Sequence, residues 1–295
     1  MFESIEALQQ ALRKENYIAD RTLATTLYLS ISMKKPIFLE GEAGVGKTDV
    51  AKVLSRLTDS RLIRLQCYEG LDANTALYEW NYAKQLLRIK MEEGSKASRH
   101  ELEETIFSPE FLIARPLLQA IQESNEKPPV LLIDEVDRSD EEFEAFLLEV
   151  LADFQITIPE IGTIQAAHKP NVILTSNRTR DVHDALKRRC LYLWIDYPTF
   201  EKELEIVLVK IPGIREELAR QICNFMQGFR EIDFYKKPGI AETLDWATAL
   251  MTLSRKTLEA EAVNETLGAI FKYQEDVIRA RQEAVPMLLA RYAGD

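Results

Sequence analysis

The chain has 295 residues, 46% of them hydrophobic, and a formal net charge of −11 at pH 7. This length and apolar content suffice to bury a core in one large globular domain or two smaller ones. The acidic balance disfavours nucleic acid as a partner, because a phosphodiester backbone is itself negative. No apolar run approaches the length needed to cross a bilayer, and the first twenty residues lack the apolar stretch of a signal peptide. We therefore expect a cytoplasmic protein with no membrane association.

Cysteine and histidine are too few and too scattered to predict a disulfide framework or a metal centre. Cys67, Cys190 and Cys223 are widely spaced and form no Cys-x-x-Cys pair, so we expect buried thiols. The three histidines show no metal-ligand spacing either.

The hydrophobic pattern predicts helices alternating with short strands over the first two thirds of the chain. Residues 4–33 have helical spacing, Ile37–Glu40 is a strand, and Thr48–Leu57 is the helix behind it. Further strands are expected at Leu62–Gln66, Val130–Ile133, Asn171–Thr175 and Leu191–Ile195, a helix at Phe111–Gln122, and a hairpin formed by Phe154–Ile158 and Ile161–Ala166. Strands interleaved with helices indicate an α/β fold with a mostly parallel sheet covered on both faces.

An insertion interrupts this alternation at about 67–105. Cys67–Arg88 carries aromatic residues among charges and is predicted to be irregular, and Glu92–Glu104 is predicted to be a solvated loop or helix end. The aromatic run Tyr78–Tyr82 suits a surface that grips a peptide and equally suits burial against the core.

Past Asp196-Tyr197-Pro198 the strand pattern ends, and only helical periodicity follows, broken at Pro212-Gly213 and Lys237-Pro238-Gly239. We therefore predict two domains, an α/β core over 1–197 and a small all-helical domain over 198–295.

The strand Ile37–Glu40 runs directly into a glycine-rich loop and then a helix. The loop reads Gly41-Glu42-Ala43-Gly44-Val45-Gly46-Lys47-Thr48. A loop of this kind presents consecutive backbone N–H groups to an anion, and its glycines allow the backbone to approach closely. Lys47 is expected at the β- and γ-phosphates of a nucleotide, and the hydroxyl of Thr48 is expected to ligate Mg²⁺.

A phosphate loop needs a second oxygen ligand for the metal, and Asp134 supplies one at the end of the strand Val130–Ile133. Glu135 beside it is placed to orient and polarise an attacking water, which a simple phosphate carrier does not need. The alternative is that the two carboxylates merely cap the following helix.

Three polar residues near later strand ends complete the candidate site. Asn177 follows the strand Asn171–Thr175 and could hold the water or contact the γ-phosphate, although a strand-terminal Asn is also a common turn residue. Arg188 and Arg189 stand just before the last strand and suit an arginine finger for a neighbouring subunit, with a surface ion pair as the alternative.

The ordered motifs "GEAGVGKT", "LLIDEVD", "LTSN" and "ALKRRC", followed by a helical domain, resemble those of AAA+ ATPases over nearly the whole chain. Within that class the chain resembles the MoxR family, and more narrowly its CoxD-like branch, through "IRLQCYEGLD", "ALYEWNYAKQLL" and "KPGIAETLDWATAL". The resemblance implies an AAA+ P-loop core with a parallel sheet between helices, followed by a helical lid.

The resemblance also implies roles for individual residues. Lys47 and Thr48 would carry phosphate and magnesium binding, and Asp134 would be the second metal ligand. Glu135 would activate water, Asn177 would be the sensor, and Arg189 would be the finger with Arg188 in reserve. Many AAA+ lids place an arginine at the start of their third helix, but Pro238–Thr243 offers none, which leaves Glu242 or Lys237 as candidates for part of that role.

The activity implied is Mg²⁺-dependent ATP hydrolysis by a ring-forming, hexameric, chaperone-like ATPase that remodels or matures partner proteins. The family commonly works with a von Willebrand factor A-domain protein, and the CoxD-like branch matures molybdenum-containing hydroxylases. Two alternatives from other classes stay open, a monomeric P-loop kinase of small molecules and a nucleic-acid motor or loader. The first is disfavoured by the combined presence of Glu135, Asn177 and the arginine pair, and the second by the net charge.

Overall fold

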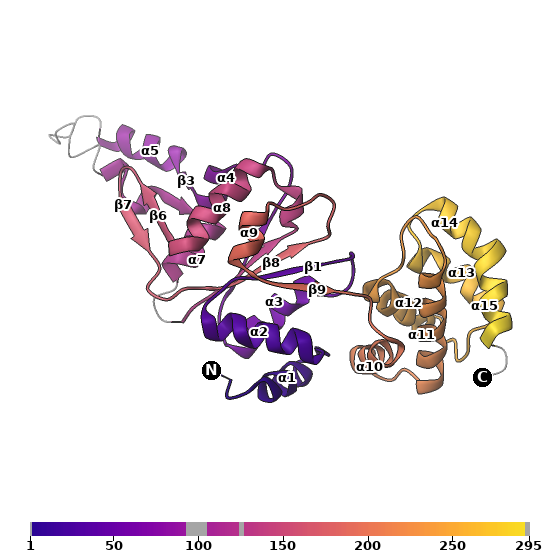
Figure 1. The fold of residues 1–295 in the computed structure, drawn as a ribbon. Coiled ribbons are helices and arrows are strands. Elements are labelled where there is room, and N and C mark those ends of the chain that lie inside the picture. Colours follow the sequence, from indigo (N-terminus) through magenta and orange to yellow (C-terminus); the bar gives the residue numbers. More distant parts are fainter. Residues whose placement is uncertain (1, 93–104, 124–126, 293–295) are drawn as a thin grey trace. The chain divides into compact units, whose positions relative to one another are not determined.

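The computed structural model describes residues 2–92, 105–123 and 127–292. They group into two compact units, each described by itself below (Figure 1). The first unit comprises 1–5, 21–40 and 48–193, and the second comprises 6–20, 41–47 and 194–295. The phosphate loop is thus grouped with the C-terminal helices. The domain boundary at 197/198 stays a prediction.

A parallel sheet with the strand order β2-β5-β8-β1-β9 forms the centre of the first unit. Its strands are β1 Ile37–Gly41, β2 Leu62–Gln66, β5 Val130–Asp134, β8 Asn171–Ser176 and β9 Leu191–Ile195. Every residue of β1, β5 and β8 is buried, as expected for central parallel strands covered on both faces. The predicted strands and the parallel sheet are confirmed.

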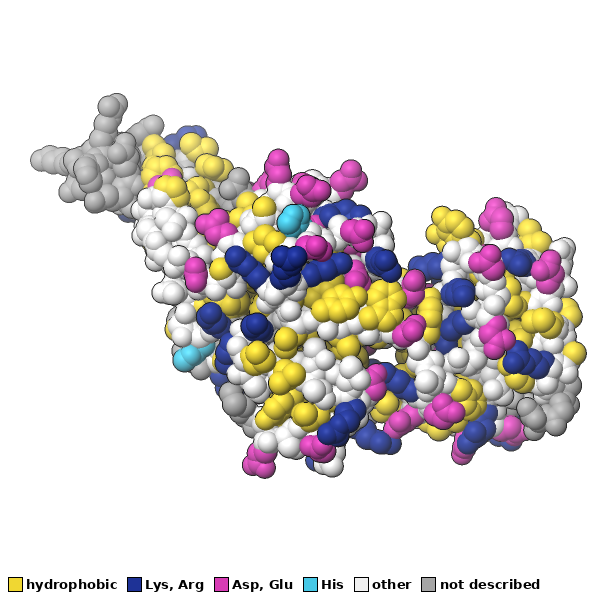
Figure 2. Space-filling model, in the orientation of Figure 1, with side chains coloured by type: hydrophobic (Ala, Val, Ile, Leu, Met, Phe, Trp, Pro, Cys, Tyr) yellow, Lys and Arg dark blue, Asp and Glu magenta, His cyan; other side chains and the backbone are white. Residues whose placement is uncertain are grey.

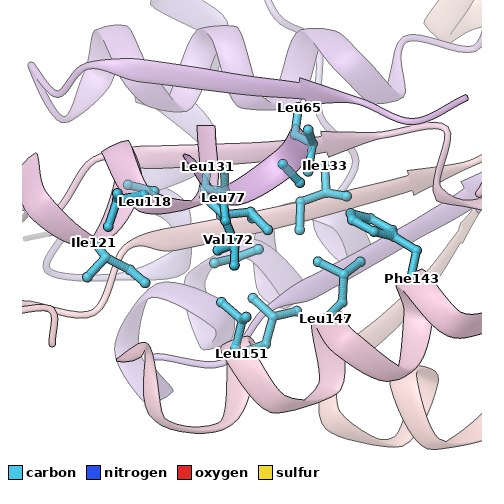
Figure 3. Packing of buried hydrophobic residues seen from close by; sticks show 14 of the residues in the cluster. Leu65, Leu77, Leu118, Ile121, Leu131, Ile133, Phe143, Leu147, Leu151 and Val172 are labelled. Carbon is cyan, nitrogen blue, oxygen red and sulfur yellow. The ribbon is translucent and has the colours of Figure 1, made fainter. Parts of the chain in front are cut away.

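Helices cover the two faces of this sheet. The helices around the sheet include α2 Arg21–Met33, α3 Lys47–Leu57, α7 Pro116–Gln122, α8 Glu141–Asp153 and α9 Asp184–Arg189. Figure 1 shows α2 and α3 on one side of the sheet and α7 and α8 on the other. Figure 3 shows the packing on the second side, where Leu131, Ile133 and Val172 of the strands meet Leu147 and Leu151 of α8.

The insertion is more regular than predicted. Cys67–Arg88 contains α4 Ala73–Leu77, β3 Tyr78–Trp80 and most of α5 Tyr82–Glu92, and β3 pairs antiparallel with β4 Leu112–Ala114. The prediction of a helix from Phe111 onward is therefore wrong at its start, since helix α7 begins only at Pro116. The reason is tertiary, because a three-residue strand is specified by pairing partners 32 to 36 residues away rather than by its own periodicity.

The aromatic run of the insertion is divided between the core and the surface. Trp80 is buried and packs edge-to-face against Phe107, with 5.3 Å between the ring centroids. Tyr82, by contrast, keeps 64% of its surface exposed. Figure 2 shows hydrophobic side chains gathered over α5, and these exposed side chains include Leu86, Leu87 and Met91. The stretch Glu92–Glu104, predicted to be a solvated loop or helix end, lies outside the described residues except for Glu92, which ends α5.

The predicted hairpin is confirmed as β6 Gln155–Ile158 paired with β7 Gly162–Gln165. Residues 199–292 contain helices and no strand, which confirms the helical C-terminal region. The second unit consists of α1 Ile5–Lys14 from residue 6 onward, α10 Phe200–Lys210, α11 Glu216–Glu231, α12 Ile240–Thr252, α13 Ala260–Ile270, α14 Gln274–Arg279, a π-helical stretch Ala280–Ala284 and α15 Val285–Tyr292.

Aromatic side chains form the centre of this helical core. Three of them are almost completely buried: Trp246, Phe225 and Phe229. Phe229 packs edge-to-face against Phe271, with 5.2 Å between the ring centroids. No helix in the described parts of the chain is long and apolar enough to cross a bilayer.

Candidate nucleotide-binding and hydrolysis site

The carboxyl ends of β2, β5 and β8 meet at one edge of the sheet, because the strands are parallel and in register. Asp134 stands at the end of β5, opposite Gln66 at the end of β2. Its Oδ1 accepts hydrogen bonds from the hydroxyls of Thr48 at 3.1 Å and Thr175 at 2.5 Å. The two residues predicted as magnesium ligands therefore lie side by side.

The spacing of these two oxygens suits a small cation. Octahedral Mg²⁺ binds oxygens at about 2.0–2.1 Å, which places neighbouring ligands about 3 Å apart. The oxygens of Thr48 and Asp134 are 3.1 Å apart, so both fit adjacent positions on one ion. The pair is also a donor set of the hard-oxygen kind that Mg²⁺ prefers.

The second oxygen of Asp134 is also satisfied. Arg64 of β2 donates to Oδ2 through Nε at 3.0 Å and Nη2 at 2.6 Å. The side chain of Asp134 is only 3% exposed, and these partners satisfy both of its oxygens. Arg64 and Thr175 were not singled out by sequence reasoning.

Glu135 is held by two amide side chains from the neighbouring strands. Its Oε1 accepts from Nδ2 of Asn177 at 3.0 Å, and its Oε2 accepts from Nε2 of Gln66 at 3.1 Å. Arg138 adds an ion pair at 3.4 Å. The backbone of Glu135 has the left-handed φ of 54°, which is uncommon for a residue other than glycine. The carboxylate is thus oriented at the end of β5 and one third exposed, where it can accept a proton from water.

A further carboxylate positions the segment that carries Asn177. Asp137 is buried, and its Oδ1 accepts the backbone N–H of Asn177 at 3.2 Å. Its Oδ2 accepts the N–H and the hydroxyl of Thr179 at 2.8 and 2.7 Å. Sequence reasoning did not assign Asp137 a role, although it stands three residues after Asp134 in the quoted motif.

The phosphate loop lies between β1 and α3. Lys47 is buried, and its Nζ donates to the carbonyls of Gly41 at 2.7 Å and Glu42 at 2.6 Å. Gly46 has φ of +93°, which side-chain-bearing residues rarely adopt. A Cβ on Gly41 would stand 2.1 Å from the carbonyl oxygen of Ile195, so this position tolerates only glycine. Lys47 thus ties the end of the loop back to its beginning, and Ala43, Gly44 and Val45 lie between these two points.

A family model for the AAA domain (dynein-related subfamily) matches residues 36–190, slightly more than half of the chain. The chain belongs to this AAA family. Nucleotide binding by a P-loop is the property that this membership carries.

Individual proteins also resemble this chain. An uncharacterized protein of Staphylococcus haemolyticus is 27% identical over 249 residues, which cover 82% of this chain and 85% of that protein. Another from Staphylococcus epidermidis is 26% identical over 243 residues, 80% of this chain and 83% of that protein. Among solved structures, a mutant of RuvB from Thermotoga maritima has a TM-score of 0.50 at 15% identity, covering 99% of this chain and 83% of that one. At this identity the likeness shows the fold alone.

In this AAA chain the start of α12 contacts the phosphate loop. The N–H of Ala241 donates to the carbonyl of Gly44 at 3.1 Å, and a Cβ on Gly239 would stand 2.8 Å from the carbonyl oxygen of Ala43. Glu242 accepts the N–H of Gly239 at 2.9 Å and so caps its own helix. Lys237 has an exposed side chain. We still predict that Glu242 or Lys237 takes over part of the role of the arginine that this lid lacks.

The arginine pair at the end of α9 is exposed to solvent. Arg188 and Arg189 are both exposed, and Arg189 donates to the backbone carbonyl of Leu148 on α8. Lys187, one residue earlier, forms an ion pair at 3.6 Å with the buried Glu40 of β1. Helix α9 is therefore anchored while its two arginines face outward.

The cysteines are free, and no cluster of potential metal-binding side chains occurs among the described residues. Burial, assisted by the negative charges of Asp134, Asp137 and Glu135, raises the pKa of the Cys67 thiol to about 12. Burial also raises the pKa of Cys190 to about 12. Neither thiol is a nucleophile at neutral pH.

Proposed function

We propose that this protein is a Mg²⁺-dependent ATPase of the MoxR type that forms rings and remodels or matures partner proteins. The observation that carries the proposal is a pairing: the oxygens of Thr48 and Asp134 lie 3.1 Å apart, a spacing that suits neighbouring Mg²⁺ ligands, and Asn177 orients the adjacent carboxylate of Glu135. A protein that merely holds phosphate needs only the first of these.

The residues divide the work of hydrolysis between them. Backbone N–H groups of the loop Gly41–Lys47 would hold the phosphates, and the ammonium of Lys47 would offset their negative charge. Magnesium, held by Thr48 and Asp134, would neutralise the charge that develops on the transferring phosphoryl group. Asn177 and Gln66 keep the carboxylate of Glu135 in one orientation, so that it can accept a proton from the attacking water.

The ring is supported by the exposure of the two arginines of α9. Because Arg188 and Arg189 are exposed, they suit the active site of an adjacent protomer. A head-to-tail contact of this kind closes into a ring, for which the MoxR resemblance suggests six subunits. The same resemblance suggests a von Willebrand factor A-domain partner and, in the CoxD-like branch, a molybdenum-containing hydroxylase as the client.

The experiment that tests this proposal measures size and turnover together. We expect light scattering to show an increase in mass when ATP and Mg²⁺ are added to the Glu135→Gln variant, which keeps the site shape but cannot activate water. The unaltered protein should hydrolyse ATP only with Mg²⁺ present. A protein that stays monomeric while it transfers phosphate to a small molecule would instead be a kinase.

A nucleic-acid motor is the second candidate, since the fold is shared with RuvB, which is described as a Holliday junction branch migration motor. The net charge of −11 opposes it, because such a chain gains little from releasing the counterions of DNA. Figure 2 shows acidic as well as basic side chains on the face in view. We expect added duplex or junction DNA to leave the ATPase rate unchanged. A several-fold stimulation that disappears at high salt would favour the motor.

A further inference from the structure

Arg64 occupies an unusual place beside the predicted magnesium ligands. It stands on the edge strand β2, two residues before Gln66, and side chains two apart on a strand point to the same face. From that face, Arg64 holds Asp134 and donates to Gln66, while Gln66 holds Glu135. One pair of side chains on β2 therefore contacts both carboxylates of the site.

A buried carboxylate such as Asp134 needs a positive partner when no metal ion is bound, and Arg64 is that partner. A carboxylate that binds Mg²⁺ does not need this second positive charge. A carboxylate that is 3% exposed is costly to ionise without a positive partner, and Arg64 supplies that charge at 2.6 Å. When Mg²⁺ binds at Oδ1, two cationic groups share one carboxylate and repel each other. The hydroxyl of Thr175 already orients Asp134 through a hydrogen bond of 2.5 Å. The main effect of Arg64 on metal binding is therefore the repulsion between its positive charge and the ion.

We propose that Arg64 is a resident counter-cation of the magnesium site, which balances the buried charge of Asp134 when no metal is bound and lowers the affinity of the site for Mg²⁺. Because Arg64 contacts Oδ2, the oxygen left for a metal ion would be Oδ1, which lies beside Thr48. A weakly held metal favours the departure of Mg²⁺ and nucleotide after hydrolysis. The proposal rests on the function proposed above.

The test titrates Mg²⁺ into protein bound to a fluorescent ADP analogue and follows the fluorescence. For Arg64→Gln we expect the half-saturating Mg²⁺ concentration to fall about three- to tenfold, because one positive charge near the metal is removed. Arg64→Lys keeps the charge and should stay near the parent value. Arg61→Gln is the matched control, since Arg61 precedes the same strand and pairs with Glu123 on the surface.

A second readout uses no nucleotide and no metal. In EDTA, Arg64→Gln should melt below Arg61→Gln, because only the former leaves a buried carboxylate without its cation. Equal melting temperatures would overturn the first half of the proposal, and an unchanged or higher half-saturating Mg²⁺ for Arg64→Gln would overturn the second. A large loss of Mg²⁺ affinity in Arg64→Lys would also overturn it, by showing that the guanidinium geometry orients the ligand. If the parent protein bound no ADP analogue at all, the proposed function itself would fail.

Discussion

Two parts of the candidate site differ in how their side chains are held. They are the carboxylates of Asp134 and Glu135 at the end of β5 and the arginine pair at the end of α9. Both oxygens of Asp134 and both oxygens of Glu135 have partners from neighbouring strands of the same chain. Arg188 and Arg189 are exposed, and Arg189 contacts the backbone of Leu148. The contrast teaches that the two carboxylates are fixed by side chains of their own chain, whereas the two arginines are exposed to solvent.

The largest expected effect comes from the arginine side of this comparison. If Arg189 is a finger in trans, Arg189→Ala should lower the ATPase rate by about 10³ to 10⁵, the range that arginine fingers contribute elsewhere. Nucleotide binding should persist, because Lys47 and the loop are intact. Steady-state turnover and the affinity for a fluorescent nucleotide measure the two effects separately.

Mixing two inactive variants decides whether the arginine acts between chains. In rings assembled from equal amounts of Arg189→Ala and Glu135→Gln, about a quarter of the interfaces join an intact Glu135 to an intact Arg189. Activity should therefore reappear although neither parent has it. If mixed rings form and stay inactive, Arg188→Ala should be put through the same test before a site shared between chains is abandoned.

For the carboxylates, we expect a substitution to reduce ATP hydrolysis at the site of the chain that carries it. Glu135→Gln should reduce the rate by about 10² to 10⁴, as expected for the removal of a general base, and should keep nucleotide affinity. Lys47→Ala is the contrasting variant, because it removes a cation from the loop and should fail at binding. A Glu135→Gln protein that hydrolysed ATP at the parental rate would show that this carboxylate does not activate water.

The comparison extends to a charge pair that is fully enclosed in the helical region. Arg230 and Glu203 are buried and joined by two hydrogen bonds of 2.6 and 2.7 Å, and Arg230 also donates to the carbonyl of Pro238. Arg230→Ala should destabilise the protein by about 3 to 5 kcal/mol, because a buried carboxylate loses its partner. Arg220→Ala, which breaks an exposed pair with Glu216, should cost less than about 1 kcal/mol. Chemical unfolding of both variants makes the measurement.

The smallest expected effect is a pH dependence near the carboxylate cluster. The pKa of Cys67 is raised from 9.0 to about 12 in the folded protein, so the thiol stabilises the fold fully below pH 9 and loses that contribution as pH rises toward 12. At pH 10 the loss is about 1.4 kcal/mol, one pKa unit. Cys67→Ala should accordingly lose less stability than the parent between pH 8 and 10, as judged by urea unfolding. If both proteins lost the same stability between pH 8 and 10, the pKa of the Cys67 thiol would not be raised in the folded protein.

Local pattern was sufficient for much of this molecule. The apolar strands, the glycine-rich loop, the hairpin and the helical C-terminal region could be predicted because strand and helix periodicity and turn chemistry are properties of short segments. The neighbourhood of Asp134 and Glu135 with Thr48 and Asn177 could be expected because parallel strands place their carboxyl ends at one edge. The insertion was predicted less well, since β3 and β4 exist through their mutual pairing.

By itself, the sequence determined which chemical groups the protein would offer: a glycine-rich loop with a lysine and a threonine, two carboxylates and an amide at strand ends, and a pair of arginines. Tertiary structure alone decided which side chains hold those groups. Gln66 and Arg64 stand 69 and 70 residues before the carboxylates they contact, and Thr175 lies 41 residues after Asp134. Nothing in a local pattern marks such partners, because they are selected by strand order and register, which hydrophobic burial of the whole sheet sets.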